Sequence, residues 1–326
     1  MVDVIRAPNH LGDFVLSLPA LAAAPEARLV VAEQLAPLAA VFRPRDSILP
    51  LKRGTAGFIA AARELRRRDL GSGILLTPSF SSALLFAVGG VTKRRGTATD
   101  ARALLLTDRV PVSPKPQHRT AVYLTLVTGA QASSSGIPRL IPSDDSRSEW
   151  RRLIGPGGAP VVAIAPGSRA SSRRWDSNRF TAIANRLLGA GARVVVLGSS
   201  DEREITATVA GTRALDLGGR TNLLVLAAGL AESRLLICND SGTMHLAAAV
   251  GTPTISLWGA GDPAVTGPVG SGHALVGTTA LPCVPCIRNS CPRRGKGTVL
   301  SDAERECMAL VSVDQVWEEV EKKLRH

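Results

Sequence analysis

The sequence predicts an α/β protein made of two Rossmann-like domains, each containing a doubly wound parallel sheet. Short apolar segments alternate with helical patterns along the whole chain, and no hairpin signal separates them, which is typical of parallel strands joined by helices. The chain has 326 residues, and because domains commonly contain about 100–150 residues, two domains of similar size are expected. Aromatic residues make up 3% and hydrophobic residues 45% of the sequence, so the cores must consist mainly of the aliphatic side chains that buried parallel strands prefer.

The first domain, residues 1–150, begins with a strand-to-helix unit and repeats it. Strands are expected at 2–7, 28–32, 48–51 and 73–77, and helices at 12–24, 35–42, 58–68, 79–88 and 119–129. The helix at 58–68 ends in three arginines, which interact favourably with the negative end of the helix dipole. Serines at the start of the helix at 79–88 are suited to N-capping.

The second domain, residues 151–326, follows a linker at about 143–158, where proline, glycine and serine accumulate and the periodicity lapses. Strands are expected at 161–165, 193–197, 235–238 and 254–258, and helices at 178–188, 201–209, 223–231 and 241–250. The segment from Val313 to Leu324 is amphipathic and is expected to form a helix that packs back on the domain junction. The two domains are expected to face each other across a cleft.

The net charge of +12 favours a polyanionic partner. We do not expect nucleic acid, because the sequence has one Tyr and six Phe and no basic run interleaved with aromatic residues. Basic clusters at 66–68 and 93–95 are either solvated surface or a contact for an anionic membrane. The sequence shows no signal peptide and no apolar run of about 18 residues, which predicts a cytoplasmic protein. No pattern specifies an oligomeric state.

The first candidate site residues lie in the turn between the opening strand and its helix. They are Asn9, His10, Gly12 and Asp13. Ligands bind at such turns, because the carboxyl ends of the strands line the binding crevice of these sheets. Gly12 lets a substrate approach the backbone closely, and Asp13 adds a carboxylate. The alternative is that Asp13 only complements the dipole of its helix as a first-turn acid.

The second candidate is the loop at 165–176, APGSRASSRRWD, which follows the first strand of the second domain. Its three Ser and three Arg offer hydroxyl, backbone N–H and guanidinium donors, which are the groups that bind a diphosphate. The sequence has neither a Walker loop nor GxGxxG at either domain opening. The alternative is a flexible basic loop. Candidate donor-binding residues in this loop are Gly167, Ser168, Arg173 and Trp175.

The third and most specific candidate is the stretch at 238–249, CNDSGTMHLAAA, in which a buried strand passes directly into an Ala-rich helix. The start of this helix offers free N–H groups and a partial positive charge to an anion. Capping by Asp240 is the structural alternative, but it does not explain the whole Asp-Ser-Gly-x-x-His set. Candidate donor-binding residues are Asp240, Ser241, Gly242, Thr243 and His245.

Four cysteines late in the chain form the fourth candidate: Cys283, Cys286, Cys291 and Cys307. In a cytosolic protein this spacing suggests zinc or an iron–sulfur cluster. Reduced structural thiols and a disulfide are the alternatives, because the paired knuckles of common zinc sites are absent. No metal is predicted as a requirement.

Taken together, these motifs resemble those of the heptosyltransferases, glycosyltransferase family 9, over nearly the whole chain. The family's opening Gly-Asp is matched at 12–13, its Pro-Gly loop ending in a basic residue and Trp at 166–175, its Asp-Ser/Thr-Gly-x-x-His helix start at 240–245, and its following Pro and strand into Trp-Gly at 253–259. A cysteine-bearing tail like that at 282–307 occurs in part of the family, and LTPSFSSAL at 76–84 resembles the members that extend the inner core, the second heptosyltransferases.

The resemblance implies a GT-B fold and inverting, metal-independent transfer of heptose from ADP-L-glycero-β-D-manno-heptose to the inner core of lipopolysaccharide. It implies that Asp13 is the general base. Arg173 stands where well-known members have a Lys that binds the donor phosphates, and the planar fork of Arg changes that geometry. The sequence has no Asp-x-Asp motif.

The resemblance also implies the partners of the protein. These are ADP-heptose and a lipid A–core acceptor at the inner leaflet of the inner membrane, so the enzyme would be peripheral on the cytoplasmic face. No cofactor is implied beyond the ADP-sugar substrate. The alternatives are a nucleotide-sugar epimerase, a family transferase with another nucleotide-sugar donor or another acceptor, including protein, and a non-catalytic nucleotide-binding pseudoenzyme.

Overall fold

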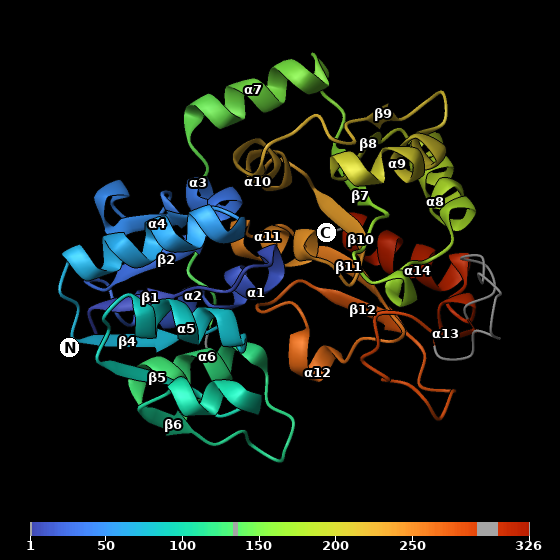
Figure 1. Cartoon of the computed structure of the whole chain (residues 1–326). Helices are drawn as coiled ribbons and strands as arrows, with labels where there is room; N and C mark the ends of the chain where they lie inside the picture. Colours follow the sequence, from blue (N-terminus) through green and yellow to red (C-terminus); the bar gives the residue numbers. More distant parts are fainter. Residues whose placement is uncertain (1, 133–135, 292–305, 326) are drawn as a thin grey trace. The chain divides into compact units, whose positions relative to one another are not determined.

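A computed structural model describes residues 2–132, 136–291 and 306–325 and divides the chain into two compact units (Figure 1). Unit 1 comprises Met1–Leu140 and unit 2 comprises Ile141–His326. Each unit contains a six-stranded sheet whose neighbouring strands pair in parallel. In both sheets the first strand of the unit lies beside the fourth, which is the topological switch point of a Rossmann-like fold.

The sheet of unit 1 has the order β3-β2-β1-β4-β5-β6. Its strands are β1 (Val4–Arg6), β2 (Arg28–Ala32), β3 (Ile48–Leu51), β4 (Ser72–Leu75), β5 (Lys93–Thr97) and β6 (Asp108–Val110). Its helices are α1 (Leu11–Leu16), α2 (Leu18–Ala22), α3 (Ala36–Ala39), α4 (Gly54–Arg67), α5 (Phe80–Val88) and α6 (Arg119–Thr128), with 3-10 turns η1 (Glu33–Leu35), η2 (Arg45–Ser47) and η3 (Asp100–Leu105). Apolar residues of α4 and α5 pack against the sheet around Val4, Val30 and Leu75.

The helix expected at 12–24 is two short helices, α1 and α2, which meet at Ser17. Pro19 lacks an N–H and therefore cannot continue the hydrogen-bond ladder of α1. The hydroxyl of Ser17 donates to the carbonyl of Phe14 over 2.7 Å, a local bond that competes with a continuous helix. As a result α1 is a separate short helix, and Asp13 lies in its first turn.

The basic cluster at 93–95 belongs to a strand, β5, that the sequence does not predict. Arg94 donates to the carbonyls of Leu105 and Val91, each over 2.6 Å. Arg95 pairs with Asp108 at 2.6 Å. Both guanidinium groups therefore bind within unit 1, whereas Lys93 is exposed.

The sheet of unit 2 has the order β12-β11-β10-β7-β8-β9. Its strands are β7 (Val161–Ala165), β8 (Arg193–Val196), β9 (Leu215–Asp216), β10 (Leu235–Asn239), β11 (Thr254–Trp258) and β12 (Ala274–Gly277). Its helices are α7 (Asp144–Ile154), α8 (Ser177–Gly189), α9 (Arg203–Ala210), α10 (Leu223–Ala231), α11 (Gly242–Val250), α12 (Pro263–Thr266), α13 (Glu306–Ala309) and α14 (Val313–Leu324), with turns η4 (Ser171–Arg173) and η5 (Ser200–Glu202).

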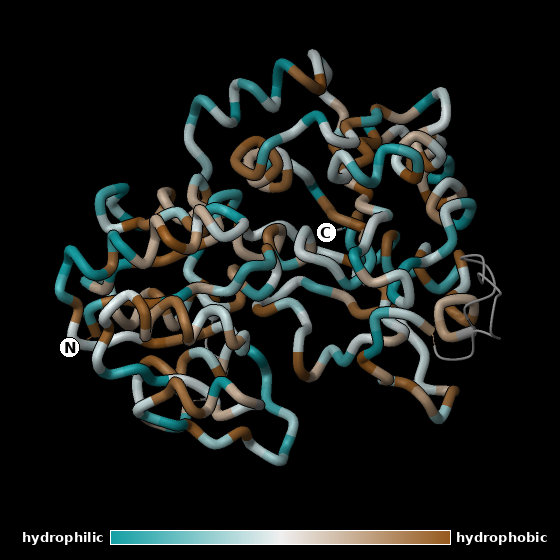
Figure 2. The backbone as a smooth tube through the Cα atoms, in the orientation of Figure 1, coloured by the Kyte–Doolittle hydropathy of each residue, from teal (hydrophilic) through white to brown (hydrophobic). Residues whose placement is uncertain are grey.

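Most of the stretch interpreted as a linker is a helix, α7. Ser143 caps it by accepting a hydrogen bond from the N–H of Ser146, and acidic and basic residues occupy its first and last turns as the helix dipole favours. Trp150 is fully buried and packs against Gly229 of α10. A Cβ on Gly229 would lie only 2.4 Å from the Trp150 ring. Figure 2 shows α7 mostly hydrophilic and α10 hydrophobic, so Trp150 attaches a polar helix to an apolar one.

One hydrophobic cluster of unit 2 lies on the α8 side of its sheet and includes the C-terminal helix. Val316 and Val320 of α14 are fully buried and pack with residues of β7, β8, β10 and α8 in one cluster. The helix expected at the end of the sequence is thus present as α14 and packs within unit 2, against α8, β11 and β12. Within the described ranges, no helix is both long enough and apolar enough to cross a membrane.

Candidate functional site

Two of the predicted motifs meet at the switch point of unit 2. β7 and β10 are neighbours and pair in parallel, so their carboxyl ends lie at the same edge of the sheet. The loop at 166–176 leaves β7 there, and the turn into α11 leaves β10 there. Ligands of doubly wound sheets bind in the crevice at this point.

Asn239, the last residue of β10, connects the two ends of the loop. Its Oδ1 accepts a hydrogen bond from the backbone N–H of Trp175 at 3.0 Å, and its Nδ2 donates to the carbonyl of Pro166 at 2.6 Å. The hydroxyl of Ser168 adds a bond to the carbonyl of Asp240 at 3.0 Å. Asn239 is fully buried. It lies within the motif at 238–249, but the sequence pattern does not distinguish it from its neighbours as a residue of the site.

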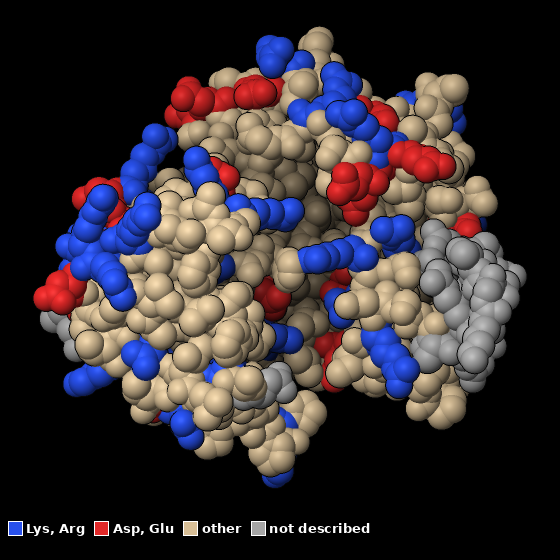
Figure 3. Space-filling model, in the orientation of Figure 1, with Lys and Arg blue, Asp and Glu red and all other residues tan. Residues whose placement is uncertain are grey.

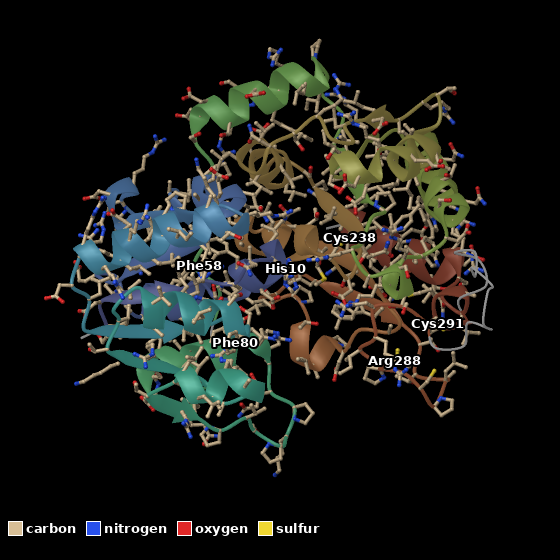
Figure 4. The ribbon with its side chains drawn as sticks, in the orientation of Figure 1. His10, Phe58, Phe80, Cys238, Arg288 and Cys291 are labelled. Carbon is tan, nitrogen blue, oxygen red and sulfur yellow. The ribbon has the colours of Figure 1, made fainter. Side chains whose placement is uncertain are left out.

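A second segment, which lies in the cysteine-bearing region, supports the loop at 166–176. We call residues 283–291 the strap. The hydroxyl of Ser172 donates to the carbonyl of Arg288 at 2.5 Å, and its N–H donates to the carbonyl of Asn289 at 3.3 Å. The strap is itself attached to the end of β11 by a bond from the N–H of Ile287 to the carbonyl of Ala260 at 2.7 Å. Figure 4 shows Arg288 and Cys291 in this segment, apart from Cys238 on β10.

Arg173, at the end of η4, forms an ion pair with Asp240. Its Nη1 lies 2.9 Å from Oδ2 of Asp240, whose side chain is 4% exposed, whereas that of Arg173 is 25% exposed. Asp240 therefore orients the guanidinium. The Nε of Arg173 is buried and has no hydrogen-bond partner among the described residues.

The start of α11 offers donors to an anion. Its N-cap is Ser241, whose side chain makes no capping hydrogen bond. The hydroxyl of Ser241 is also buried without a hydrogen-bond partner within the described part of the chain. Since helix N-termini carry free N–H groups and a partial positive charge, these donors and Arg173 suit a phosphate group.

The other predicted residues of unit 2 are buried or half-buried. A Cβ on Gly167 would lie 2.0 Å from Oε1 of Glu202, so a larger residue here would require the Glu202 side chain to move. Trp175 is fully buried, and its indole donates to the carbonyl of Val311 at 2.9 Å. This corrects its interpretation as a residue that contacts the donor, because its ring lies in the core. His245 is 4% exposed on α11, and Gly242 and Thr243 are half-buried at the helix start.

The predicted residues of unit 1 lie at its own switch point, between β1 and β4. Asn9 and His10 are exposed, and Gly12 and Asp13 are half-buried. Figure 4 shows His10 at the start of α1. Arg6 at the end of β1 is 2% exposed, and its guanidinium donates to Oδ1 of Asn9 and, at 2.6 Å, to the carbonyl of Ala7. Arg6 thus fixes the turn before Asp13, and burial lowers its pKa to about 10.

Two residues of α6 contact the carboxylate of Asp13. The hydroxyl of Tyr123 donates to Oδ1 at 3.3 Å, and Nη1 of Arg119 lies 3.9 Å from the same oxygen. Tyr123 is 3% exposed. Burial raises the pKa of Tyr123, and the negative charge of Asp13 raises it further, so the phenol stays protonated and remains a donor. The sequence gives no signal for these contacts, because more than a hundred residues separate Asp13 from α6.

The four late cysteines gather near one another in unit 2. Burial raises the pKa of the Cys307 thiol, and the charges of Cys286, Cys291 and Cys283 also raise it. All are free thiols in the structure, as is Cys238. Over the described residues, no group of three or more His, Cys, Asp or Glu side chains has an arrangement that would hold a metal ion.

Comparison with known proteins gives a consistent result. The model of glycosyltransferase family 9 (heptosyltransferase) matches residues 58–296. The lipopolysaccharide heptosyltransferase 2 of Escherichia coli strain K12 is 27% identical over 229 residues, which are 63% of this chain and 64% of that protein. Among the curated relatives most similar to this chain, the matched stretch spans 38–66% of the relative's length.

Solved structures extend the likeness to the whole fold. The E. coli ADP-heptose lipopolysaccharide heptosyltransferase II superposes with a TM-score of 0.81 at 20% identity, covering 99% of this chain and 98% of that one. TibC of enterotoxigenic E. coli H10407, described as an iron-containing dodecameric glycosyltransferase, has a TM-score of 0.61 at 17% identity, covering 100% of this chain and 77% of that one. The chain accordingly has the GT-B fold predicted from the sequence.

Proposed function

Because the chain belongs to glycosyltransferase family 9, the heptosyltransferases, we propose that it transfers a heptose from ADP-L-glycero-β-D-manno-heptose to the inner core of lipopolysaccharide, with inversion. Unit 2 binds the donor and unit 1 binds the acceptor. One observation carries the donor assignment. Arg173, oriented by Asp240, and the start of α11 lie at the switch point of one sheet.

In the proposed reaction, Asp13 accepts the proton of the acceptor hydroxyl while the acceptor oxygen bonds to the anomeric carbon of the heptose. The bond from that carbon to the diphosphate breaks, and ADP leaves with the electron pair. A single displacement of this kind inverts the anomeric centre and needs one base. Arg173 and the N–H groups of α11 stabilise the charge that develops on the leaving diphosphate. These donors, together with the absence of an Asp-x-Asp motif, support a metal-independent transfer.

Transfer is tested with purified protein, ADP-heptose and a heptose-free core acceptor, by measuring ADP release. We expect release that depends on the acceptor, and a product anomer opposite to that of the donor. Asp13→Asn should lower the rate by about 10²–10⁴, the range for loss of a general base. Turnover of Asp13→Asn within about threefold of wild type would remove the base assignment.

The same assay separates the alternatives. A transferase with another donor or another acceptor releases nucleotide only with a different sugar nucleotide or with a protein acceptor. A pseudoenzyme binds ADP without turnover, and an epimerase changes the sugar without an acceptor. Asp13, with a side chain that is 31% exposed, favours an enzyme, because a protein that only binds nucleotide needs no base.

We further propose that unit 1 contacts an anionic membrane from the cytoplasmic side. Lys and Arg side chains gather over the C-terminal end of α4 (Figure 3), where Arg63, Arg66 and Arg67 are exposed. Ion pairs of Arg67 and Arg68 with Glu64 reduce this charge only in part. Binding to vesicles that contain phosphatidylglycerol should fall as salt rises, because screening weakens exposed charges.

The cysteine cluster has no assigned part in this reaction. The iron of TibC makes metal analysis of the purified protein worthwhile, although the described residues of this chain do not form a ready metal site. A stoichiometric metal that is absent from Cys307→Ser would support a structural metal. If neither the wild-type protein nor Cys307→Ser contains metal, the result would support reduced structural thiols.

A further inference from the structure

We propose that Arg119 and Tyr123 form a positioning pair that holds one carboxylate oxygen of Asp13 and leaves the other for the acceptor hydroxyl. The inference rests on the proposed role of Asp13 as the base. It concerns two residues of α6 that neither the motifs nor the comparisons assign. Both residues approach the same atom, Oδ1 of Asp13.

The first step is the geometry of the pair. Arg119 and Tyr123 are four residues apart on α6, so their side chains lie on the same face of the helix. Tyr123 donates a hydrogen bond to Oδ1 and Arg119 places a positive charge beside it. Oδ2 of Asp13 has no hydrogen bond or ion pair with any residue that the structure describes. A carboxylate held by one oxygen in this way presents the second oxygen in a fixed direction.

The second step is that the pair is held by the fold. Tyr123 is 3% exposed and packs inside unit 1, and α6 packs against both α1 and α2. His118 caps α6 by accepting a hydrogen bond from the N–H of Thr120, which fixes the start of the helix beside Arg119. A buried phenol with one charged acceptor has few alternative positions, so it restricts the rotation of the carboxylate.

The third step concerns the charges that face Asp13. α1 contains no other titratable residue, and α2 contains none. On α6 only Arg119 and Tyr123 titrate, and His10 and His118 stand at the N-caps of α1 and α6. Arg119 and Tyr123 are thus the groups of these helices that contact the carboxylate, and both contact its Oδ1.

The test uses Tyr123→Phe, Arg119→Gln and Arg119→Lys, with Arg45→Gln as the control for loss of an exposed arginine of unit 1. Tyr123→Phe should lower kcat by about tenfold, which corresponds to one charge-assisted hydrogen bond, with the KM values for donor and acceptor and the affinity for ADP unchanged. Arg119→Gln should also lower kcat with the KM values unchanged, because the carboxylate loses one of the two groups beside its Oδ1. Arg119→Lys should restore part of that kcat, and Arg45→Gln should leave kcat unchanged.

The outcomes separate this proposal from the proposed function. If Asp13→Asn is inactive but Tyr123→Phe and Arg119→Gln keep the kcat of wild type, the positioning role is wrong and the base stands. A higher acceptor KM with unchanged kcat in Arg119→Gln would mean that Arg119 binds the acceptor, which also overturns it. If no transfer is detected, the proposed function fails. The positioning pair is then tested by a measurement that needs no substrate. The ¹³C signal of the Asp13 carboxyl, assigned with Asp13→Asn, should change position at neutral pH in Tyr123→Phe, which removes the hydrogen bond to Oδ1, and an unchanged signal rejects the pair.

Discussion

Gly261→Ala tests whether Asp240 orients Arg173 for the donor. A Cβ at this position would lie 2.2 Å from Oδ2 of Asp240 and 3.1 Å from the ring of Trp258. Ordinary contacts to a Cβ begin near 3.4 Å, so the carboxylate must move by about 1 Å or more. Arg173 Nη1 lies 2.9 Å from that oxygen, and the displaced carboxylate would no longer hold the guanidinium. The substitution thus disturbs the phosphate site without removing any charged group.

The expected magnitude follows from the contact that is lost. A hydrogen bond from a charged group contributes about 1.5–3 kcal/mol, which corresponds to about tenfold to hundredfold weaker binding of ADP. Isothermal titration with ADP measures the affinity, and thermal unfolding shows whether the fold persists. Gly158→Ala is the matched control, because a Cβ there meets nothing within 4 Å.

The reasoning is refuted if Gly261→Ala binds ADP within twofold of wild type and of Gly158→Ala. If Gly261→Ala does not fold, Asp240→Asn removes the negative partner of Arg173 without added volume. Its affinity for ADP should fall by a similar factor. An affinity equal to or higher than that of wild type in Asp240→Asn would show that Arg173 needs no orienting carboxylate.

Two further predictions concern stability. Asn239→Ala leaves the N–H of Trp175 and the carbonyl of Pro166 without their buried partner. We therefore expect an unfolding free energy that is lower by about 2–4 kcal/mol in denaturant titration, and weaker binding of ADP. A loss below about 0.5 kcal/mol would show that the loop does not depend on Asn239. Burial lowers the pKa of His273, which contacts Thr254 at 3.0 Å. As pH falls below about 6.5, His273 therefore takes up a proton in the unfolded chain before it does so in the folded protein. The unfolding free energy that this histidine contributes above that pH is lost below it. Between pH 7.5 and 5 the melting temperature should fall less in His273→Gln than in wild type.

Much of the fold is readable from the sequence, because buried parallel strands are continuous apolar runs. The strands β2, β3, β7 and β11 and the helices α10 and α14 have the bounds that the sequence predicts. β5 was not predicted because Lys93, Arg94 and Arg95 hide its strand character, and the distant partners of Arg94 and Arg95, the Leu105 carbonyl and Asp108, cannot be read from a local pattern. α7 was hidden by the Pro and Gly residues that follow it, although Ser143 is a regular N-cap.

The site was predictable where its residues are contiguous. The loop after β7 and the turn after β10 stand next to strands, and the sheet order alone brings them together. The partners of Asp13 on α6 depend on how α6 packs against α1, which no local pattern encodes. Trp175 was predicted as a donor-binding residue from its place at the end of the loop, yet its ring packs in the core against Phe180, with centroids 5.0 Å apart.

The strap supports the phosphate loop through the carbonyls of Arg288 and Asn289. Main-chain acceptors are the same whatever side chain a residue carries, so relatives are free to differ at 288 and 289 without loosening Ser172. An insertion of one residue between Cys286 and Cys291 would instead shift both acceptors out of register with η4. For this part of the molecule, the spacing between cysteines should therefore be a better guide to loop geometry than the identity of the residues between them.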